Sequence, residues 1–301
     1  MTVPLTRRSL LTLLSGAGFL AACSGPKQRL GVQNGTLPRA WLQRLPAGWG
    51  FESIPLGTAL PKPSQSSGLG PLALTDGWAT SQPASHWLPW PASAATQLLM
   101  PEAQALLPWG LPVAMGPWLL VLRDRPDLWQ SLADKAGWQL LLHPSLRGQL
   151  LLPASQRVVL DIAKRMGNQA EIMEQLKQQA LGFNDVDALT LLLNGEAQAA
   201  VLPSRAVVPL LRSDSRLRAF LPIQGAPLWW NLLVRPASAA AIPPLEWLLA
   251  PSKSPLLDQL LRAGFTPPLK LPLLAAALSR QPQAQLLRPP AELLERCTTI
   301  M

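Results

Sequence analysis

The segment from residue 148 to residue 203 constrains the fold most, because strand patterns and amphipathic helix patterns alternate along it. The run GQLLLP is continuously apolar, which is typical of a parallel strand buried on both faces. SQRVVLDIAKRMG follows with apolar residues at helical spacing, and EIMEQLKQQA and NDVDALTLLLNGE predict two further helices. AQAAVLP then predicts the next strand. This order predicts an α/β fold with a mostly parallel sheet.

Polar residues and glycines predict where these helices begin and end. Ser155 can accept a backbone hydrogen bond at the start of the first helix, and Gly167 ends that helix. Asn184 or Asp185 is expected to cap the third helix, which Gly195 closes. The sequence therefore predicts both ends of the first and the third helix.

The flanking segments carry weaker patterns of the same kind. GFESIPLG (50–57) and GPLALTDGW (70–78) predict short strands that end in turns. An apolar strand is expected over 118–122, followed by a helix from Asp127 that Gly137 ends. A short helical pattern near residue 94 is broken at Pro101. Three C-terminal helices are predicted in PPLEWLLA, SPLLDQLLRAG and PAELLERC.

The N-terminus has the pattern of an export signal. Arg7 and Arg8 precede an apolar run over 10–20, which is shorter than the roughly 20 residues that cross a bilayer. The pair resembles a twin-arginine signal, and the following LAAC resembles the lipobox of bacterial lipoproteins. We expect cleavage before Cys23 and two lipid tails on that cysteine, which hold a protein stably at a membrane. A short membrane anchor with an incidental cysteine is the alternative.

Charge and cysteine content limit the partners. Removing residues 1–22 leaves 301 − 22 = 279 residues with a net charge of (26 − 2) − 17 = +7. The basic residues are scattered, with no basic run interleaved with aromatics, so we expect no nucleic-acid partner. The charge fits attraction to an anionic membrane surface. If Cys23 carries lipid, Cys297 has no disulfide partner, and we expect it to be a buried helix residue.

The sequence lacks the common motifs of enzymes and metal sites. His86 and His143 are the two histidines, and no HExxH, CxxC, GxSxG or GK[ST] motif occurs. We therefore expect no catalytic residue, metal or cofactor. A hydrolase built on His86 or His143 stays open as an alternative, which requires a serine or a carboxylate beside the histidine.

Several segments, in order, resemble the periplasmic solute-binding proteins of ABC importers. They are LLLHPSLRGQLLLPASQRVVLDIAKRMG, GFNDVDALTLLLNGEAQAAVLPSRAV, FLPIQGAPLWWNLLVRPASA and the closing helices, together covering roughly 138–297. The likeness is to the branch that includes the spermidine/putrescine-binding proteins. It implies a type II fold of two α/β lobes, with a ligand cleft between lobes that close by a hinge motion.

The resemblance also implies a division of the chain and its partners. The expected parts are a lipoprotein signal peptide (1–22), a first lobe (23–117), a second lobe (118–233) and a return to the first lobe (234–301). The expected location is the periplasm, with a membrane anchor at Cys23. The expected partners are a small solute and a membrane permease, near which the anchor keeps a monomeric protein at high effective concentration.

The family's cleft residues are only partly kept. Trp229 matches the cleft tryptophan, whose face attracts alkylammonium groups by a cation–π interaction. Asn231 replaces a family carboxylate, Ala154 and Arg157 match two further acids, and Pro203 matches a further aromatic residue. A buried ammonium needs a counter-charge, so these replacements favour a neutral or anionic solute, whereas the fold implies an amine.

Ser155 and Arg157 open a predicted helix, where backbone N–H groups and the helix dipole favour an anion. Arg157 could bind a carboxylate or phosphate through two parallel hydrogen bonds, and a solvated helix position is its alternative. Core packing is the alternative for Trp229. Trp230 is expected in the core, on the opposite face of the strand.

The run TDGW adds candidates from the first lobe. Asp76 and Trp78 follow a strand, at the end where open α/β sheets bind ligands. Asp76 could supply a counter-charge to an amine, or could cap its own turn. Ser204, after the strand in AQAAVL, is a candidate polar contact. The sequence thus predicts a lipid-anchored solute-binding protein for an ABC importer and no enzyme, with a scaffold lipoprotein of the same fold as the alternative.

Overall fold

The computed structural model describes residues 28–56, 70–132, 136–184, 186–237, 239 and 241–299. The predicted export signal, the lipobox with Cys23, and Asp185 lie outside the described residues. Within these ranges, no helix combines the length and the apolar character needed to cross a bilayer.

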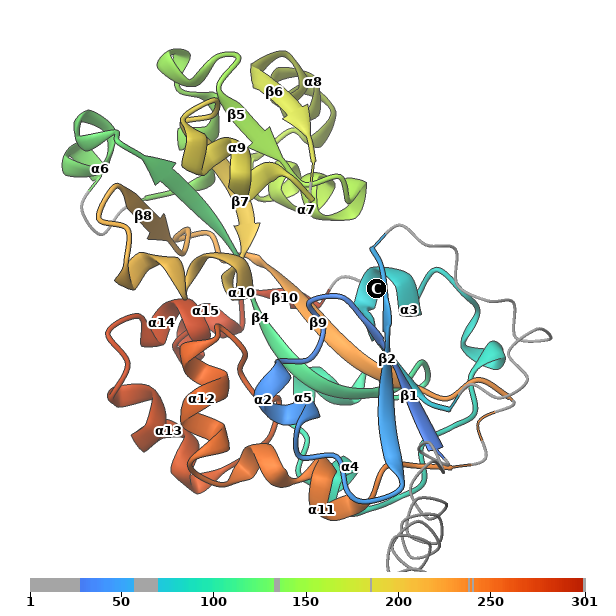
Figure 1. Cartoon of the computed structure of the whole chain (residues 1–301). Coiled ribbons are helices and arrows are strands. Elements are labelled where there is room, and N and C mark those ends of the chain that lie inside the picture. Colours follow the sequence, from blue (N-terminus) through green and yellow to red (C-terminus); the bar gives the residue numbers. More distant parts are fainter. Residues whose placement is uncertain are drawn as a thin grey trace, which may run out of the picture.

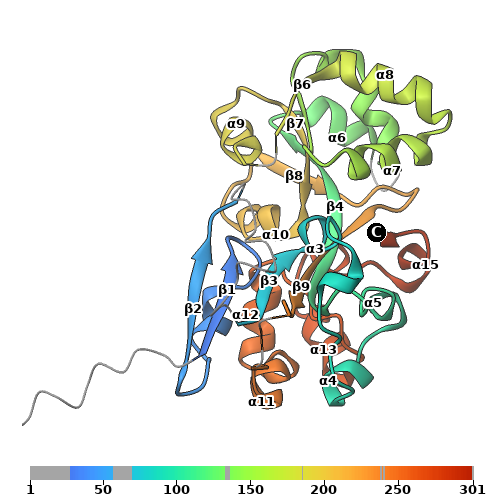
Figure 2. The same cartoon turned by 90° about the vertical axis from the view of Figure 1, so that its right-hand side faces the viewer.

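Strand β4 (Leu111–Arg123) passes through the whole molecule and changes partners along its length. Its first half pairs antiparallel with β9 (Pro227–Val234), and its second half pairs antiparallel with β7 (Ala199–Pro203) and β8 (Leu217–Phe220). We call the strands on the two halves of β4 the first and the second half-sheet. Figures 1 and 2 show that they form two separate parts of the molecule, which β4 joins.

The first half-sheet has the strand order β2-β1-β3-β9-β4. Its strands β1 (Gln28–Gln33), β2 (Trp49–Ile54) and β3 (Leu72–Thr75) are parallel, whereas β9 runs antiparallel to β3. The short strand β10 (Thr298–Thr299) pairs parallel with β9. The helices of this part that precede β4 are α2 (Arg39–Leu42), α3 (Asp76–Ala79), α4 (Ala94–Gln97) and α5 (Pro101–Gln104).

The second half-sheet places β5 (Leu150–Leu152) between β6 (Ala180–Phe183) and β7, parallel to both. Its helices are α6 (Pro126–Leu132), α7 (Gln156–Met166), α8 (Gln169–Gln179), α9 (Ala188–Asn194) and α10 (Ser204–Val207). After β9 the chain forms α11 (Leu245–Leu248), α12 (Leu256–Arg262), α13 (Pro272–Ser279), α14 (Ala284–Leu287) and α15 (Ala291–Leu294).

The predicted α/β order is confirmed, with differences at helix ends. Helix α7 buries Val158, Val159 and Ile162 on one face, as its apolar spacing predicts. The prediction that Ser155 caps α7 is wrong: Ser155 occupies the cap position, but its side chain makes no cap hydrogen bond. Asn184 caps the turn before α9 rather than the helix itself, because its Oδ1 accepts from the N–H groups of residues 186 and 187.

The strand pairing places one crossing between the half-sheets earlier than the sequence interpretation does. Strand β9, expected at the end of the second lobe, pairs with β3 in the first half-sheet, so the chain returns before Pro227. The C-terminal helices do not pack on the first half-sheet alone. Leu257 of α12 and Leu274 of α13 share a buried cluster with Leu119 and Val121 of β4. The C-terminal segment therefore packs against both parts of the molecule.

Candidate functional site

A cavity of about 550 Å³ lies where three strands of the two half-sheets end. Strand β3 ends at α3, β5 is followed by α7, and β7 ends at α10. Carboxyl ends of strands are where open α/β sheets bind ligands. The described residues that line the cavity are Leu56, Thr75, Asp76, Gly77, Trp78, Ser81, Trp118, Ser155, Gln156, Arg157, Val158, Leu202, Pro203, Arg205 and Trp229.

Two arginines from the second half-sheet line this cavity. Arg157 lies in the first turn of α7, and its Nη1 donates to Thr80 Oγ1 at 3.2 Å. Since Thr80 ends α3, this hydrogen bond joins the two parts of the molecule. Arg205 lies on α10, directly after β7. The sequence interpretation missed Arg205, although it follows a strand end just as Arg157 does, and that position is the signal that could have identified it.

Trp229 is held rigidly beside these arginines. Its side chain is 1% exposed, and its Nε1 donates to Ser204 Oγ at 3.0 Å. Phe265 packs edge-on against it, with ring centroids 5.8 Å apart. The guanidinium carbon of Arg205 lies 4.6 Å from the centroid of the Trp229 ring. The protein's own arginine therefore makes the cation–π contact that the sequence interpretation expects from a ligand amine.

Asp76 is the acid among the described lining residues. It opens α3, is half-buried, and accepts a hydrogen bond from Gly77 N–H through Oδ1 at 2.9 Å. Burial raises the pKa of Asp76 to about 6, against the charges of Arg157 and Arg205, which lower it. The effect of desolvation on this pKa is thus larger than the opposing effect of the two nearby cations. Asp76 loses its proton near pH 6, so the cavity gains a negative charge as the pH rises through that value.

The structure gathers most of the predicted site residues around the cavity. Its lining includes Asp76, Trp78, Ser155, Arg157 and Trp229. Trp118, Ser81 and Gln156 also line it and were not predicted. Trp118 belongs to the apolar strand that the sequence did predict, so only the pairing of that strand could reveal its role.

Asn231 and Ser204 lie outside the cavity lining. Asn231 is fully buried in the first half-sheet, where its Nδ2 donates to Thr36 O at 2.7 Å. Ser204 is also fully buried and accepts the hydrogen bond from Trp229. Ser204 therefore positions the indole ring. Trp230 is fully buried in the core, as the alternation along the strand predicts.

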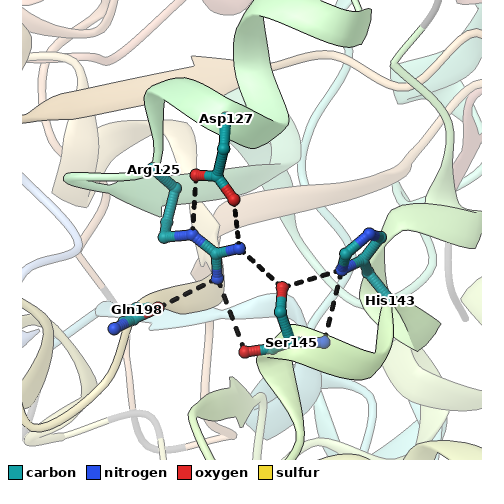
Figure 3. A network of polar contacts seen from close by, with 5 residues as sticks. All are labelled: Arg125, Asp127, His143, Ser145 and Gln198. Atoms are coloured by element: carbon teal, nitrogen blue, oxygen red, sulfur yellow. Dashed lines mark hydrogen bonds and ion pairs between the residues drawn. The ribbon is translucent and has the colours of Figure 1, made fainter.

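The histidines lie away from this cavity. His143 Nδ1 is 2.7 Å from Ser145 Oγ, so the condition for the hydrolase alternative is met in part (Figure 3). However, Arg125 binds both oxygens of Asp127 at 2.9 and 2.6 Å and donates to Ser145 Oγ at 2.5 Å. The carboxylate thus faces the arginine in this cluster. His86 Nδ1 lies 3.2 Å from Gln82 Oε1.

The cluster in Figure 3 has a structural explanation. Arg125 Nη1 also donates to Gln198 Oε1 at 2.9 Å, and Gln198 directly precedes β7. The cavity lies at the opposite end of that strand. Arg125 is 8% exposed, and its hydrogen bonds join the start of α6, the short 3-10 helix Pro144–Leu146 and the residue before β7. The charge is satisfied by these partners, which is the usual requirement for a buried guanidinium.

The described part of the chain has no cluster of metal ligands and one free thiol. It contains no group of three or more His, Cys, Asp or Glu side chains placed to hold a metal ion. Cys297 is buried, as predicted, but it lies after the end of α15 and not in a helix, so that part of the prediction is wrong. Burial raises the pKa of its thiol.

Comparison with known proteins places the fold. No family model matches the chain, and no curated protein sequence matches it. A spermidine/putrescine ABC transporter substrate-binding protein from Streptococcus pneumoniae has a similar structure, with a TM-score of 0.69 and 14% identity over 92% of this chain and 93% of that chain. An ABC transporter substrate-binding protein from Bradyrhizobium japonicum gives a TM-score of 0.67 and 13% identity, over 92% and 94%.

A third similar structure carries a bound acid. It is a binding protein from A. tumefaciens in complex with agropinic acid, with a TM-score of 0.61 and 12% identity over 86% of this chain and 91% of that chain. Sequence identities this low establish the architecture alone. The chain therefore has the α/β fold of the periplasmic solute-binding proteins.

Proposed function

We propose that this chain is an extracytoplasmic binding protein that holds a small anionic solute in the 550 Å³ cavity and delivers it to an ABC importer. The observation that carries the proposal is the position of Arg205, 4.6 Å from the centroid of the Trp229 ring. A ligand amine at this ring would meet a guanidinium, so the usual reason for a cleft tryptophan to bind a polyamine is lost.

An anion suits the same groups. Guanidinium groups bind carboxylates and phosphates bidentately, and a hydrogen bond to a charged group contributes about 1.5–3 kcal/mol. Arg157 also lies in the first turn of the 11-residue helix α7, whose N–H groups and dipole favour negative charge. The protein from A. tumefaciens, in which this fold accompanies a bound acid, supports the proposal.

The test is calorimetric titration of residues 24–301 with succinate, citrate, phosphate, neutral amino acids, putrescine and spermidine. We expect saturable binding of an anion, and we expect Arg157→Ala and Arg205→Ala each to weaken it about tenfold or more. The matched control is Arg218→Met, because the Arg218 guanidinium carbon lies 5.1 Å from the Trp129 ring centroid, outside the cavity lining.

The possible outcomes separate the alternatives. Micromolar binding of spermidine with no anion bound would overturn the proposal. If no compound in the panel bound, the scaffold lipoprotein would become the better explanation. Equal losses in Arg218→Met and Arg205→Ala would show that stability had been lost rather than a ligand contact.

The location and the partners form a second part of the proposal. Export and lipidation at Cys23 would hold the monomeric protein at the membrane beside its permease, as the sequence pattern indicates. The similarity to ABC transporter substrate-binding proteins supports a permease partner. The test is cell fractionation: the wild-type chain should sediment with membranes, and Cys23→Ser should change that distribution. An unchanged distribution would contradict the anchor.

A further inference from the structure

The charged groups of the cavity are divided between its two walls. Asp76 and Trp78 come from α3, beside the first half-sheet. Arg157 and Arg205 come from α7 and α10, beside the second half-sheet. The Arg157 guanidinium reaches across to α3, where it donates to Thr80 Oγ1 at 3.2 Å. A ligand that touches both walls therefore meets an acid and an indole from α3 and two guanidinium groups from α7 and α10.

We infer that the preferred solute is an amine-bearing dicarboxylate, with two anionic groups for the arginine wall and one ammonium group for the Asp76 wall. This inference rests on the proposed anion-binding function and names the class of ligand. The ligand's two negative charges and one positive charge oppose, group for group, the two guanidiniums and one carboxylate of the lining.

Simpler ions complement the cavity less well. A dicarboxylate without an amine would place further negative charge near the Asp76 carboxylate, and like charges in a partly buried site repel. A diamine would place at least one ammonium near Arg157 or Arg205. A monocarboxylate with one amine would leave one guanidinium without a ligand carboxylate, which forgoes a charge-assisted hydrogen bond.

The Asp76 wall can hold an ammonium group. Hydrogen bonds from the backbone N–H groups of Gly77 and Trp230 occupy only part of the capacity of the carboxylate, which has about four lone-pair sites. Burial makes the ionised form of Asp76 unfavourable even with Arg157 and Arg205 nearby, as its pKa of about 6 shows, so an ammonium in direct contact with the carboxylate would stabilise that form. Trp78 lies two residues further along α3 and also lines the cavity, and an indole face attracts cations.

Four short compounds separate these possibilities in calorimetric titrations of the full chain in detergent. They are L-glutamate, glutarate (which lacks the amine), γ-aminobutyrate (which lacks one carboxylate) and 1,4-diaminobutane (which has no acid). We expect L-glutamate to bind about tenfold or more tightly than each of the others. Glutarate binding as tightly as L-glutamate would overturn the inference and leave the proposed function standing. Binding of 1,4-diaminobutane alone would overturn both.

Asp76→Asn provides the second test, with Asp127→Asn as the matched control outside the cavity. We expect Asp76→Asn to remove the preference for L-glutamate over glutarate while glutarate binding is kept or strengthened. Asp127→Asn should leave the preference unchanged. A preference that survives Asp76→Asn would overturn the inference.

Proton exchange gives a readout that a purely structural role would not produce. Near pH 6 an ammonium beside Asp76 should displace its proton, whereas glutarate should cause proton uptake, with Arg157 and Arg205 as the charged groups that also act on Asp76. Titrations in two buffers of different ionisation enthalpy measure this exchange. The same sign for both ligands would contradict an ammonium contact at Asp76.

Discussion

Asp76→Asn should stabilise the unliganded protein at neutral pH, because the native carboxylate is ionised in a partly buried site. In the unfolded chain Asp76 loses its proton near pH 3.8, whereas burial in the folded chain raises its pKa to about 6. The folded state therefore binds more protons between these values, and stability falls as the pH rises through this window. The loss persists above pH 6. A difference of about two pKa units corresponds to roughly 2–3 kcal/mol.

Asparagine cannot ionise, so the variant does not lose folding stability at this position as the pH rises through this window. The stability of Asp76→Asn relative to the wild type should therefore rise by roughly 2–3 kcal/mol between about pH 4 and pH 7.5. For a chain of this size that corresponds to a relative rise in Tm of roughly 4–10 °C. Differential scanning calorimetry across this pH range measures it directly.

A control of opposite sign accompanies this experiment. The side-chain hydrogen bond from Arg125 lowers the pKa of Asp127, so Asp127→Asn should destabilise the protein at neutral pH and lose that effect as the pH falls. If the gap in Tm between Asp76→Asn and the wild type stayed constant with pH, or narrowed toward pH 7.5, the conclusion that burial raises the pKa of the Asp76 carboxylate would be refuted.

Three further substitutions test how the site is built. Asn231→Asp, which restores the family's acid, should give no polyamine binding and should lower stability by several kcal/mol, because position 231 is fully buried against Thr36; spermidine binding in calorimetry would contradict this. Ser204→Ala should cost about 1–3 kcal/mol by leaving the Trp229 N–H without its acceptor, and an unchanged urea midpoint would argue against that hydrogen bond. Gly116→Ala should weaken anion binding and lower Tm, since a Cβ there would overlap Ser204 Oγ and lie 2.8 Å from Trp229 Cζ2; wild-type values in both assays would show that Ser204 and the ring can shift freely.

Local patterns in the sequence predicted many, but not all, of the elements of this fold. The apolar spacing of Val158, Val159 and Ile162 predicted α7, and Gly195 ends α9 in the left-handed conformation that glycine adopts readily. The strand ends at Thr75 and Pro203 were also predicted, and with them most of the cavity wall. These features depend on residues a few positions apart, whose periodicity the chain carries itself.

Trp229 and Asn231 show that local patterns do not predict which residues of a strand line the cavity. They are two residues apart, so they face the same side of β9, and the family resemblance assigned both to the cleft. The pairing separates them: Gly116 lies opposite Trp229, where β4 changes partners, whereas Thr75 lies opposite Asn231 within the first half-sheet. Whether a position on a strand is buried in the sheet or reaches the cavity depends on which strands lie beside it. A local sequence pattern does not contain that information.

The sequence by itself determined that the chain alternates strands and helices and that polar residues follow the strand ends. The family resemblance added the prediction that the acids expected of a polyamine site are missing. Only the tertiary structure decided what those residues do. It places the Arg205 guanidinium over the ring of Trp229, 24 positions later in the sequence. It also determines the pKa of Asp76, which burial raises and two nearby cations lower. Both results are contacts between segments far apart in the chain, whose energies depend on distance and burial, and packing alone fixes these quantities.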